Sequence, residues 1–233
     1  MDILAVLYSG VARVRPREAE WPHRDRVILS KGHAAMALYA VLAECGFLDV
    51  AELDTYGKPG SRLCGHADWN VPGVDVSTGS LGHGLSIGCG IALAGKASDN
   101  PWRVFAVLSD GECQEGSVWE AAMFAAHHGL NNLTVVVDRN GLQACGSTED
   151  VLCLEPFADK WKAFGWTVTT VDGHEPQALW LAMSQPLDAP HIIIARTVKG
   201  KGVSFMENRV EWHYRHPDRN ELAVALSELE PPA

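Results

Sequence analysis

Short runs of β-branched and aliphatic residues alternate along the chain with longer segments whose apolar residues recur at helical spacing. The runs at 27–29, 104–108, 133–137, 167–171 and 191–197 have the length and composition of buried parallel strands. Helices are expected at 2–14, 34–45, 85–96, 118–125, 157–164 and 176–185. The alternation predicts an α/β fold, a doubly wound and mostly parallel sheet with helices on both faces.

The segment 104–140 forms the centre of this arrangement. Between its two strand runs, one helical face is formed by Val118, Ala121, Ala122 and Ala125. A right-handed β-α-β crossover makes the two strands parallel and places both carboxyl ends at one edge of the sheet. Asp110 and Asn140 follow the two strands, so we expect both side chains at the edge where open α/β sheets bind ligands.

The residue types at this edge suit a metal-bound diphosphate. Carboxylate and amide oxygens are ligands for a hard cation, and Mg²⁺ commonly takes one or two protein groups together with phosphate oxygens. The backbone N–H groups of Gly111 and Glu112 open the following helix, where the helix dipole favours phosphate. The plainer interpretation, two strand ends with ordinary turn residues, stays open on this segment alone.

Composition and charge narrow the class of protein. The chain has 233 residues, 47% of them hydrophobic, which suits a single domain over 1–233 with a flexible tail at 218–233. Its formal charge of −10, without a basic run, argues against nucleic acid or a membrane as partner. Six cysteines without a Cys-x-x-Cys pair, and a start without a secretory signal, predict a cytoplasmic protein.

The central motifs resemble those of a known family. Asp110-Gly-Glu, followed after a βα unit by Asn140-Gly-Leu, resembles the thiamine diphosphate signature, and Asp-Gly-Glu-Cys-Gln-Glu-Gly at 110–116 resembles transketolase in particular. The resemblance implies the thiamine diphosphate-binding fold, with Mg²⁺ held by Asp110, the Asn140 side chain and the Leu142 carbonyl. It also implies that Gly111 approaches the diphosphate of the cofactor.

Two histidine motifs extend the resemblance towards the N-terminus. Leu-Ser-Lys-Gly-His-Ala at 29–34 resembles the transketolase motif in which the histidine, here His33, contacts the diphosphate. In isolation such a histidine is more often a helix cap or a buried imidazole. Gly65-His66 resembles the family's Gly-His-Pro, with Ala67 in place of proline, and this implies that His66 hydrogen-bonds substrate and transfers protons.

Two further motifs complete the set of candidate residues. Gly79, Ser80 and Leu81 resemble the family's Thr-Gly-x-Leu-Gly-Gln-Gly, whose backbone contacts the aminopyrimidine, although His83 replaces the usual glutamine. Trp212-His213 resembles the family's Trp-His-Gly, with Tyr214 in place of glycine. This implies that His213 reaches both the diphosphate and the substrate. Either a changed substrate or a tolerated exchange accounts for His83.

The resemblance covers the diphosphate-binding half of a transketolase. It implies one component of a split enzyme, inactive alone, that forms its site with a separate pyrimidine-domain chain, two copies of each chain assembling. The reaction implied is transfer of a two-carbon ketol unit from a ketose or ketose phosphate to an aldose. Glu115 and Glu120 resemble acids that link paired sites across the interface.

Two other functions stay open. The first is decarboxylative acyl or glycolyl transfer with the same cofactor, and the second is a degenerate subunit that serves assembly. Both are motivated in part by the N-terminus, since the family's Gly-His-Pro-Gly-Gly motif normally precedes the helix that begins here at Asp2. Either this chain lacks that active-site histidine, or its start is assigned too late.

Overall fold

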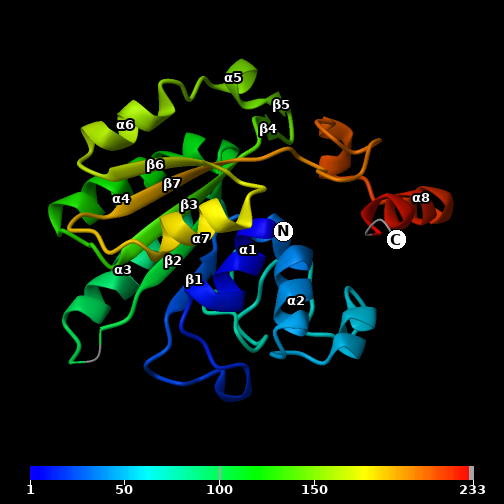
Figure 1. The fold of residues 1–233 in the computed structure, drawn as a ribbon, viewed down its shortest axis with the longest axis horizontal. Coiled ribbons are helices and arrows are strands. Elements are labelled where there is room, and N and C mark those ends of the chain that lie inside the picture. The colour runs from blue at the N-terminus through cyan, green and yellow to red at the C-terminus, as the bar shows by residue number, and fades with distance from the viewer. Residues whose placement is uncertain (100, 231–233) are drawn as a thin grey trace.

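A five-stranded parallel sheet forms the middle layer of the molecule (Figure 1). The computed structural model describes residues 1–99 and 101–230. The strand order is β1-β2-β3-β7-β6, and each neighbouring pair is parallel. The strands are β1 (Arg26–Leu29), β2 (Val104–Ser109), β3 (Leu133–Arg139), β6 (Thr167–Asp172) and β7 (His191–Arg196). The predicted parallel β-α-β unit is confirmed by the pairing of β2 with β3.

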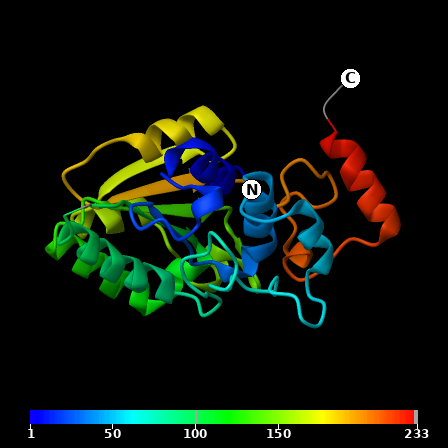
Figure 2. The ribbon, with the colours of Figure 1, turned by 90° about the horizontal axis from the view of Figure 1, so that it is seen from below.

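Helices cover both faces of this sheet (Figure 2). Alternate strand residues point to opposite faces. Val107 and Val136 therefore pack with α1, α2 and α7, whereas Ala106 and Val135 pack with α3, α4 and α6. These two buried clusters confirm the predicted doubly wound arrangement. The helices are α1 (Asp2–Val6), α2 (Ala35–Glu44), α3 (His83–Lys96), α4 (Gly116–His127), α6 (Phe157–Ala163) and α7 (Pro176–Ser184).

The first helix is shorter than the sequence predicts. The apolar pattern predicts a helix over 2–14, but α1 passes into a π-helical turn over Leu7–Val11, and Ala12 is already extended. Gly10 breaks the helical dihedral angles inside this turn. The chain then runs to Asp25, whose fully buried carboxylate binds Arg13 and Arg103 and so ties the end of the turn to β2.

The C-terminal segment also differs from the prediction. Instead of a flexible tail over 218–233, the structure has a helix, α8 (Arg219–Leu229), which begins with a capping box between Asp218 and Glu221. Residues 231–233 lie outside the described residues. A short hairpin of β4 (Leu142–Gln143) and β5 (Gly146–Ser147), followed by α5 (Thr148–Val151), lies after β3 and was not predicted. In the part of the chain that the structure describes, no helix has the length and apolar character to cross a membrane.

Candidate functional site

The carboxyl ends of β1, β2, β3 and β7 meet at one edge of the sheet and carry the polar groups of the site. Asp138, near the end of β3, is the centre of a hydrogen-bond network. Its carboxylate accepts from the Lys31 ammonium, the Thr197 hydroxyl and, at 3.3 Å, the Asn140 amide. Lys31 follows β1 and Thr197 follows β7, so this carboxylate joins three strand ends.

The charge of Asp138 is balanced within the protein. Burial alone would raise its pKa, but Lys31 and the hydrogen bonds from Thr197 and Asn140 outweigh burial and lower the pKa far below its usual value. Asp138 therefore stays ionised at neutral pH. Because its oxygens are committed to these donors, it holds Lys31 at the edge of the cleft.

Asp110 lies at the end of β2 and is fully buried. One carboxylate oxygen accepts from the backbone N–H of Gly111 at 2.8 Å, and the other accepts from the N–H of Gly141 at 2.6 Å and from Arg139 at 3.2 Å. Burial raises the pKa of Asp110, although Gly141, Gly111 and Arg139 oppose the shift. This carboxylate is therefore less well compensated than Asp138 and would gain from a further cation.

The bond from Gly141 brings the loop after β3 onto Asp110. In that loop the Asn140 side-chain oxygen accepts from the N–H of Leu142 at 3.0 Å. The Asp110 carboxylate thus lies beside the turn that contains Asn140 and Leu142, and carboxylate, amide and carbonyl oxygens are ligands of a hard divalent cation. The donor set fits Mg²⁺ in kind. The three residues predicted as metal ligands come from adjoining segments at the same edge.

Glu112, whose backbone N–H the sequence predicts at a phosphate, engages both its side chain and its N–H within the protein. Its side chain is fully buried and accepts from the Ser30 hydroxyl, from the N–H of Gly82 at 2.9 Å and from the N–H of Ser109 at 3.2 Å. Its own N–H donates to the Ser109 hydroxyl, and the N–H of Gly111 donates to Asp110. Glu112 therefore fastens the loop that ends at Gly82 to the end of β1.

Two glycines let the histidine-bearing segments approach closely. A Cβ atom on Gly79, which has a φ of +146°, would lie 2.9 Å from the His66 ring. A Cβ atom on Gly32 would lie 2.7 Å from the backbone nitrogen of Gly79. His33, which follows Gly32, meets His66 edge to face with ring centroids 4.9 Å apart. The predicted residues His33, His66 and Gly79 therefore lie together, and Ser80 and Leu81 follow Gly79 in the chain.

His213 completes the opposite side. It lies on the short 3₁₀ helix Val210–His213, and its Nδ1 is 3.3 Å from the Lys199 ammonium. An ammonium group only donates, so Nδ1 accepts and neutral His213 carries its proton on Nε2. Burial, and then the charges of Lys199, His33 and Lys31, lower the pKa of His213. Burial and Lys31 also lower the pKa of Lys199. The mutual repulsion of these groups would be relieved by an anion bound between them.

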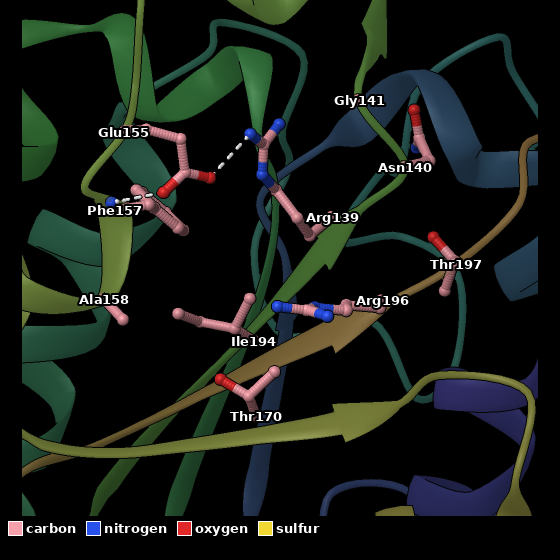
Figure 3. Close-up of a pocket in the computed structure, with 10 residues that line it drawn as sticks. All are labelled: Arg139, Asn140, Gly141, Glu155, Phe157, Ala158, Thr170, Ile194, Arg196 and Thr197. Atoms are coloured by element: carbon pink, nitrogen blue, oxygen red, sulfur yellow. Dashed lines mark hydrogen bonds and ion pairs between the residues drawn. The ribbon is translucent and has the colours of Figure 1, made fainter.

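Two cavities open at this edge. One, of about 550 Å³, is lined by Lys31, Asp138, Asn140, Thr197 and Lys199 among others, and is the natural place for an anionic ligand. The other, of about 420 Å³, lies on the side of α6, where Arg139 binds Glu155, and Arg196, Ile194 and Thr170 line the opposite wall (Figure 3). Arg139 thereby reaches from this second cavity to Asp110.

Comparison with known proteins decides the family. The model for the transketolase thiamine diphosphate binding domain matches residues 1–226. This chain belongs to the transketolase family. It is 40% identical over 232 residues to one of the subunits of the apulose-4-phosphate transketolase of Phocaeicola vulgatus, covering 98% of this chain and 83% of that protein. It is 41% identical over 233 residues to the 6-deoxy-6-sulfo-D-fructose transketolase subunit SqwG of a Clostridium species, covering 98% and 85%.

Longer transketolases match this family member over a part of their length. Human transketolase is 41% identical over 229 residues, which are 98% of this chain and 37% of the human protein. The solved transketolase of Campylobacter jejuni has a TM-score of 0.84 at 29% identity and is matched over 90% of this chain and 34% of its own. The chain therefore spans about a third of such transketolases, and it shares the fold of their thiamine diphosphate-binding domain.

Some site residues of this transketolase-family chain are not predicted from the sequence. Lys31 lies inside the motif that contains His33, but the sequence assigns it no role, and Asp138, Thr197 and Lys199 are likewise unassigned. Their position in the sequence could have identified them, since each stands within three residues of the carboxyl end of a strand in the same sheet. Which of these ends are neighbours depends on the strand order, and the order places β7 beside β3.

Proposed function

We propose that this chain is the diphosphate-binding subunit of a two-chain transketolase. The reaction is the thiamine diphosphate- and Mg²⁺-dependent transfer of a two-carbon ketol unit from a ketose or ketose phosphate to an aldose. The observation that carries the proposal is that Lys31 and Lys199 line one cleft together with Asn140, and that their charges and that of His33 act on His213. A diphosphate bridged to a metal matches this arrangement of charges.

The proposed roles follow from the chemistry of each group. Asp110, Asn140 and the Leu142 carbonyl would hold Mg²⁺, because a buried carboxylate with a raised pKa is stabilised by a cation. Lys199 and His33 would bind diphosphate oxygens, whereas the N–H of Gly111 donates to Asp110. When bound, thiamine diphosphate supplies the carbanion chemistry, and the protein orients the reactants.

His66 and His213 are placed to handle substrate protons. The Nε2–H of neutral His213 is free to donate while Nδ1 is held by Lys199. The backbone carbonyl of His66 accepts from the Tyr39 hydroxyl at 2.7 Å, which fixes the segment that presents its ring. We assign both histidines to hydrogen bonding and proton transfer at the substrate, a role that imidazole groups commonly serve as general acids and bases.

The second chain is supported by the relatives. Three of them are named as subunits of transketolases, and each matches nearly the whole of this chain. A partner chain would supply the pyrimidine domain, and we propose two copies of each chain, with Glu115 and Glu120, both exposed, at the interface. Six free cysteines agree with a cytoplasmic location.

Calorimetric titration tests this proposal. Thiamine diphosphate with Mg²⁺ is titrated into this chain alone, into the pyrimidine-domain protein alone, and into their mixture. The expected result is saturable binding in the mixture that is lost when Mg²⁺ is chelated. Absence of binding in all three samples would overturn the proposal and favour a degenerate chain that serves assembly.

A further inference from the structure

His174 joins the N-terminal helix to the loop that carries Lys199. Its Nδ1 lies 2.8 Å from the Asp2 carboxylate at the start of α1, and its Nε2 lies 2.8 Å from the backbone nitrogen of Val198. These partners are 172 and 24 positions away in the sequence. The imidazole is half-buried between the two segments.

The two contacts define the tautomer of this ring. A backbone N–H only donates, so Nε2 of His174 must present its lone pair to Val198. The neutral ring then carries its proton on Nδ1 and donates it to Asp2. A carboxylate at this position favours that tautomer and its orientation, as in other histidines whose second nitrogen is fixed by a neighbour. Both ring nitrogens are therefore engaged in linking separate segments.

The turn that presents His174 is itself rigid. The N–H of His174 donates to the Asp172 carboxylate at 2.8 Å, and the N–H of Gly173 donates to the carbonyl of Arg196 at 2.7 Å. A Cβ atom on Gly173 would lie 2.4 Å from the Thr197 methyl group. Glycine at this position lets the turn lie directly against the end of β7. The imidazole thus has a fixed base from which to hold Val198.

The loop beyond Val198 connects the His174 anchor to the site residues Lys199 and His213. Lys199 is the next residue, and its ammonium contacts His213, while its carbonyl accepts from the N–H of Asn208 at 2.9 Å. Asp2, His174, Val198 and Lys199 all line the 550 Å³ cleft. A shift of the Val198 backbone would therefore move the Lys199 side chain relative to Lys31 and Asp138 across the cleft.

We propose that His174 is a positioning residue that, with Asp2, holds the segment 198–199 so that Lys199 and His213 face the diphosphate. It acts through Val198, because both of its ring nitrogens are engaged by Asp2 and by Val198. The inference deepens the proposed function and rests on it, because Lys199 and His213 matter to the reaction only if a diphosphate binds beside them.

Three variants test the anchor, each in the full chain. His174→Ala removes both hydrogen bonds, Asp2→Ala removes the partner of Nδ1, and His174→Gln supplies an amide with one acceptor and one donor. Glu175→Ala is the matched control, because Glu175 is the exposed neighbour and its side chain does not cap α7. Asp2 is 42% exposed, so its variant should fold even if His174→Ala does not.

The first readout does not depend on function. Hydrogen–deuterium exchange of the Val198 amide in the chain alone should be at least tenfold faster in His174→Ala, nearer wild type in His174→Gln, and unchanged in Glu175→Ala. The second readout is the affinity for thiamine diphosphate with Mg²⁺ in the two-chain complex. His174→Ala and Asp2→Ala should each weaken it about tenfold, and the double variant should lose little more, because both act on one anchor.

The outcomes separate the two claims. If the wild-type complex binds the cofactor, and Val198 exchange and affinity are unchanged in both alanine variants, the anchor is overturned and the proposed function stands. If the wild-type complex binds no cofactor, the proposed function fails, and with it the proposal that His174 positions residues for cofactor binding. Positioning through the bond to Val198 would also be contradicted if His174→Ala and His174→Gln both lost cofactor affinity while the exchange rate of the Val198 amide stayed at the wild-type value.

Discussion

Two buried carboxylates at the cleft differ in how their charge is balanced. Asp138 is neutralised within the protein by Lys31 and two further donors, whereas Asp110 accepts from two backbone N–H groups and the edge of Arg139. The pKa of Asp138 is lowered by these partners, and that of Asp110 is raised, mainly by burial. We therefore assign lysine positioning to the first and cation binding to the second.

Asp110→Asn tests this assignment. The change removes the one carboxylate assigned to the metal while keeping its size, so Mg²⁺-dependent affinity for thiamine diphosphate should fall at least tenfold, about 1.4 kcal/mol. The free energy of unfolding of the chain without metal should fall by about 1–3 kcal/mol, because the amide nitrogen of asparagine cannot accept the N–H bonds that one of the two carboxylate oxygens accepts. Calorimetry over a range of Mg²⁺ concentrations measures the first effect and urea unfolding the second. Equal affinity in wild type and variant would remove Asp110 from the metal site.

Gly79→Ala tests the close approach of the two histidine-bearing segments. Gly79 has a φ of +146°, and an added Cβ would lie 2.9 Å from the His66 ring, so alanine should destabilise the chain by roughly 1–3 kcal/mol and displace His66. Gly90→Ala is the matched control, because Gly90 lies within α3 and a Cβ there meets nothing within 4 Å. That variant should be neutral or slightly stabilising. Urea midpoints that fall equally in both variants would contradict the steric argument.

At the scale of elements, β7 is the strand that joins the site to the core. It lies between β3 and β6, and its carboxyl end leads into Thr197 and Lys199. Its first residue, His191, is buried at the opposite edge and its Nε2 is 2.9 Å from the Thr169 hydroxyl. Stability of the sheet at this edge therefore depends on a titratable group far from the catalytic residues.

His191 should make stability depend on pH. Burial lowers its pKa from 6.5 to about 4, so between these values the unfolded chain binds more protons than the folded one. The stabilisation is complete above about pH 6.5 and is lost as the pH falls towards 4, a change on the order of 3 kcal/mol. Urea unfolding at pH 7.5 and pH 5 should show a smaller difference for His191→Gln than for wild type. His127→Gln, an exposed control, should keep the wild-type slope.

Most helices and strands could be predicted from the hydrophobic pattern, because strands covered on both faces of a sheet are apolar along their whole length. The runs at 104–108 and 133–137 are buried strands, and the helix between them ends at His127, followed by Gly129 with a φ of +54°. In α8 the apolar residues Leu222, Ala225, Leu226 and Leu229 recur at helical spacing and a capping box precedes them, but only Ala225 of the four is buried, so tertiary packing adds little to these local signals.

The motifs of the site could be predicted from the sequence, but the hydrogen bonds between its distant residues could not. Asp110, Asn140 and the histidines lie in recognisable strings, whereas the bonds of Asp138 to Lys31 and of His174 to Val198 join residues 107 and 24 positions apart. Such pairs are set by the strand order and the loop paths, and local spacing does not encode them. Glu112 shows the converse, since a residue inside the strongest motif turns its side chain into the interior.

At the scale of the whole molecule, the chain is a domain whose site lies open at one edge of its sheet. Nearly the whole chain matches a region that makes up about a third of longer transketolases. The cleft is lined by α1, the strand ends, the loop 198–206 and Leu229 of α8, and under the proposed function a pyrimidine-domain chain completes the site. The complex is therefore the unit on which the reaction has to be measured.

The choice of donor distinguishes the proposed reaction from its alternative. Under the proposed function His66 and His213 serve the hydroxyl groups of a sugar substrate, so the reconstituted pair should transfer a two-carbon unit from a ketose phosphate to an aldose without release of CO₂. Decarboxylative transfer with the same cofactor would instead consume a 2-keto acid and release CO₂. Parallel assays of aldose-linked product and of CO₂ measure the two reactions on one preparation.

In His66→Ala, ketol transfer should fall at least a hundredfold while cofactor affinity changes less than threefold, because general acid–base groups contribute about 10²–10⁴ to the rate. Turnover of the 2-keto acid alone would transfer the assignment to the decarboxylative reaction.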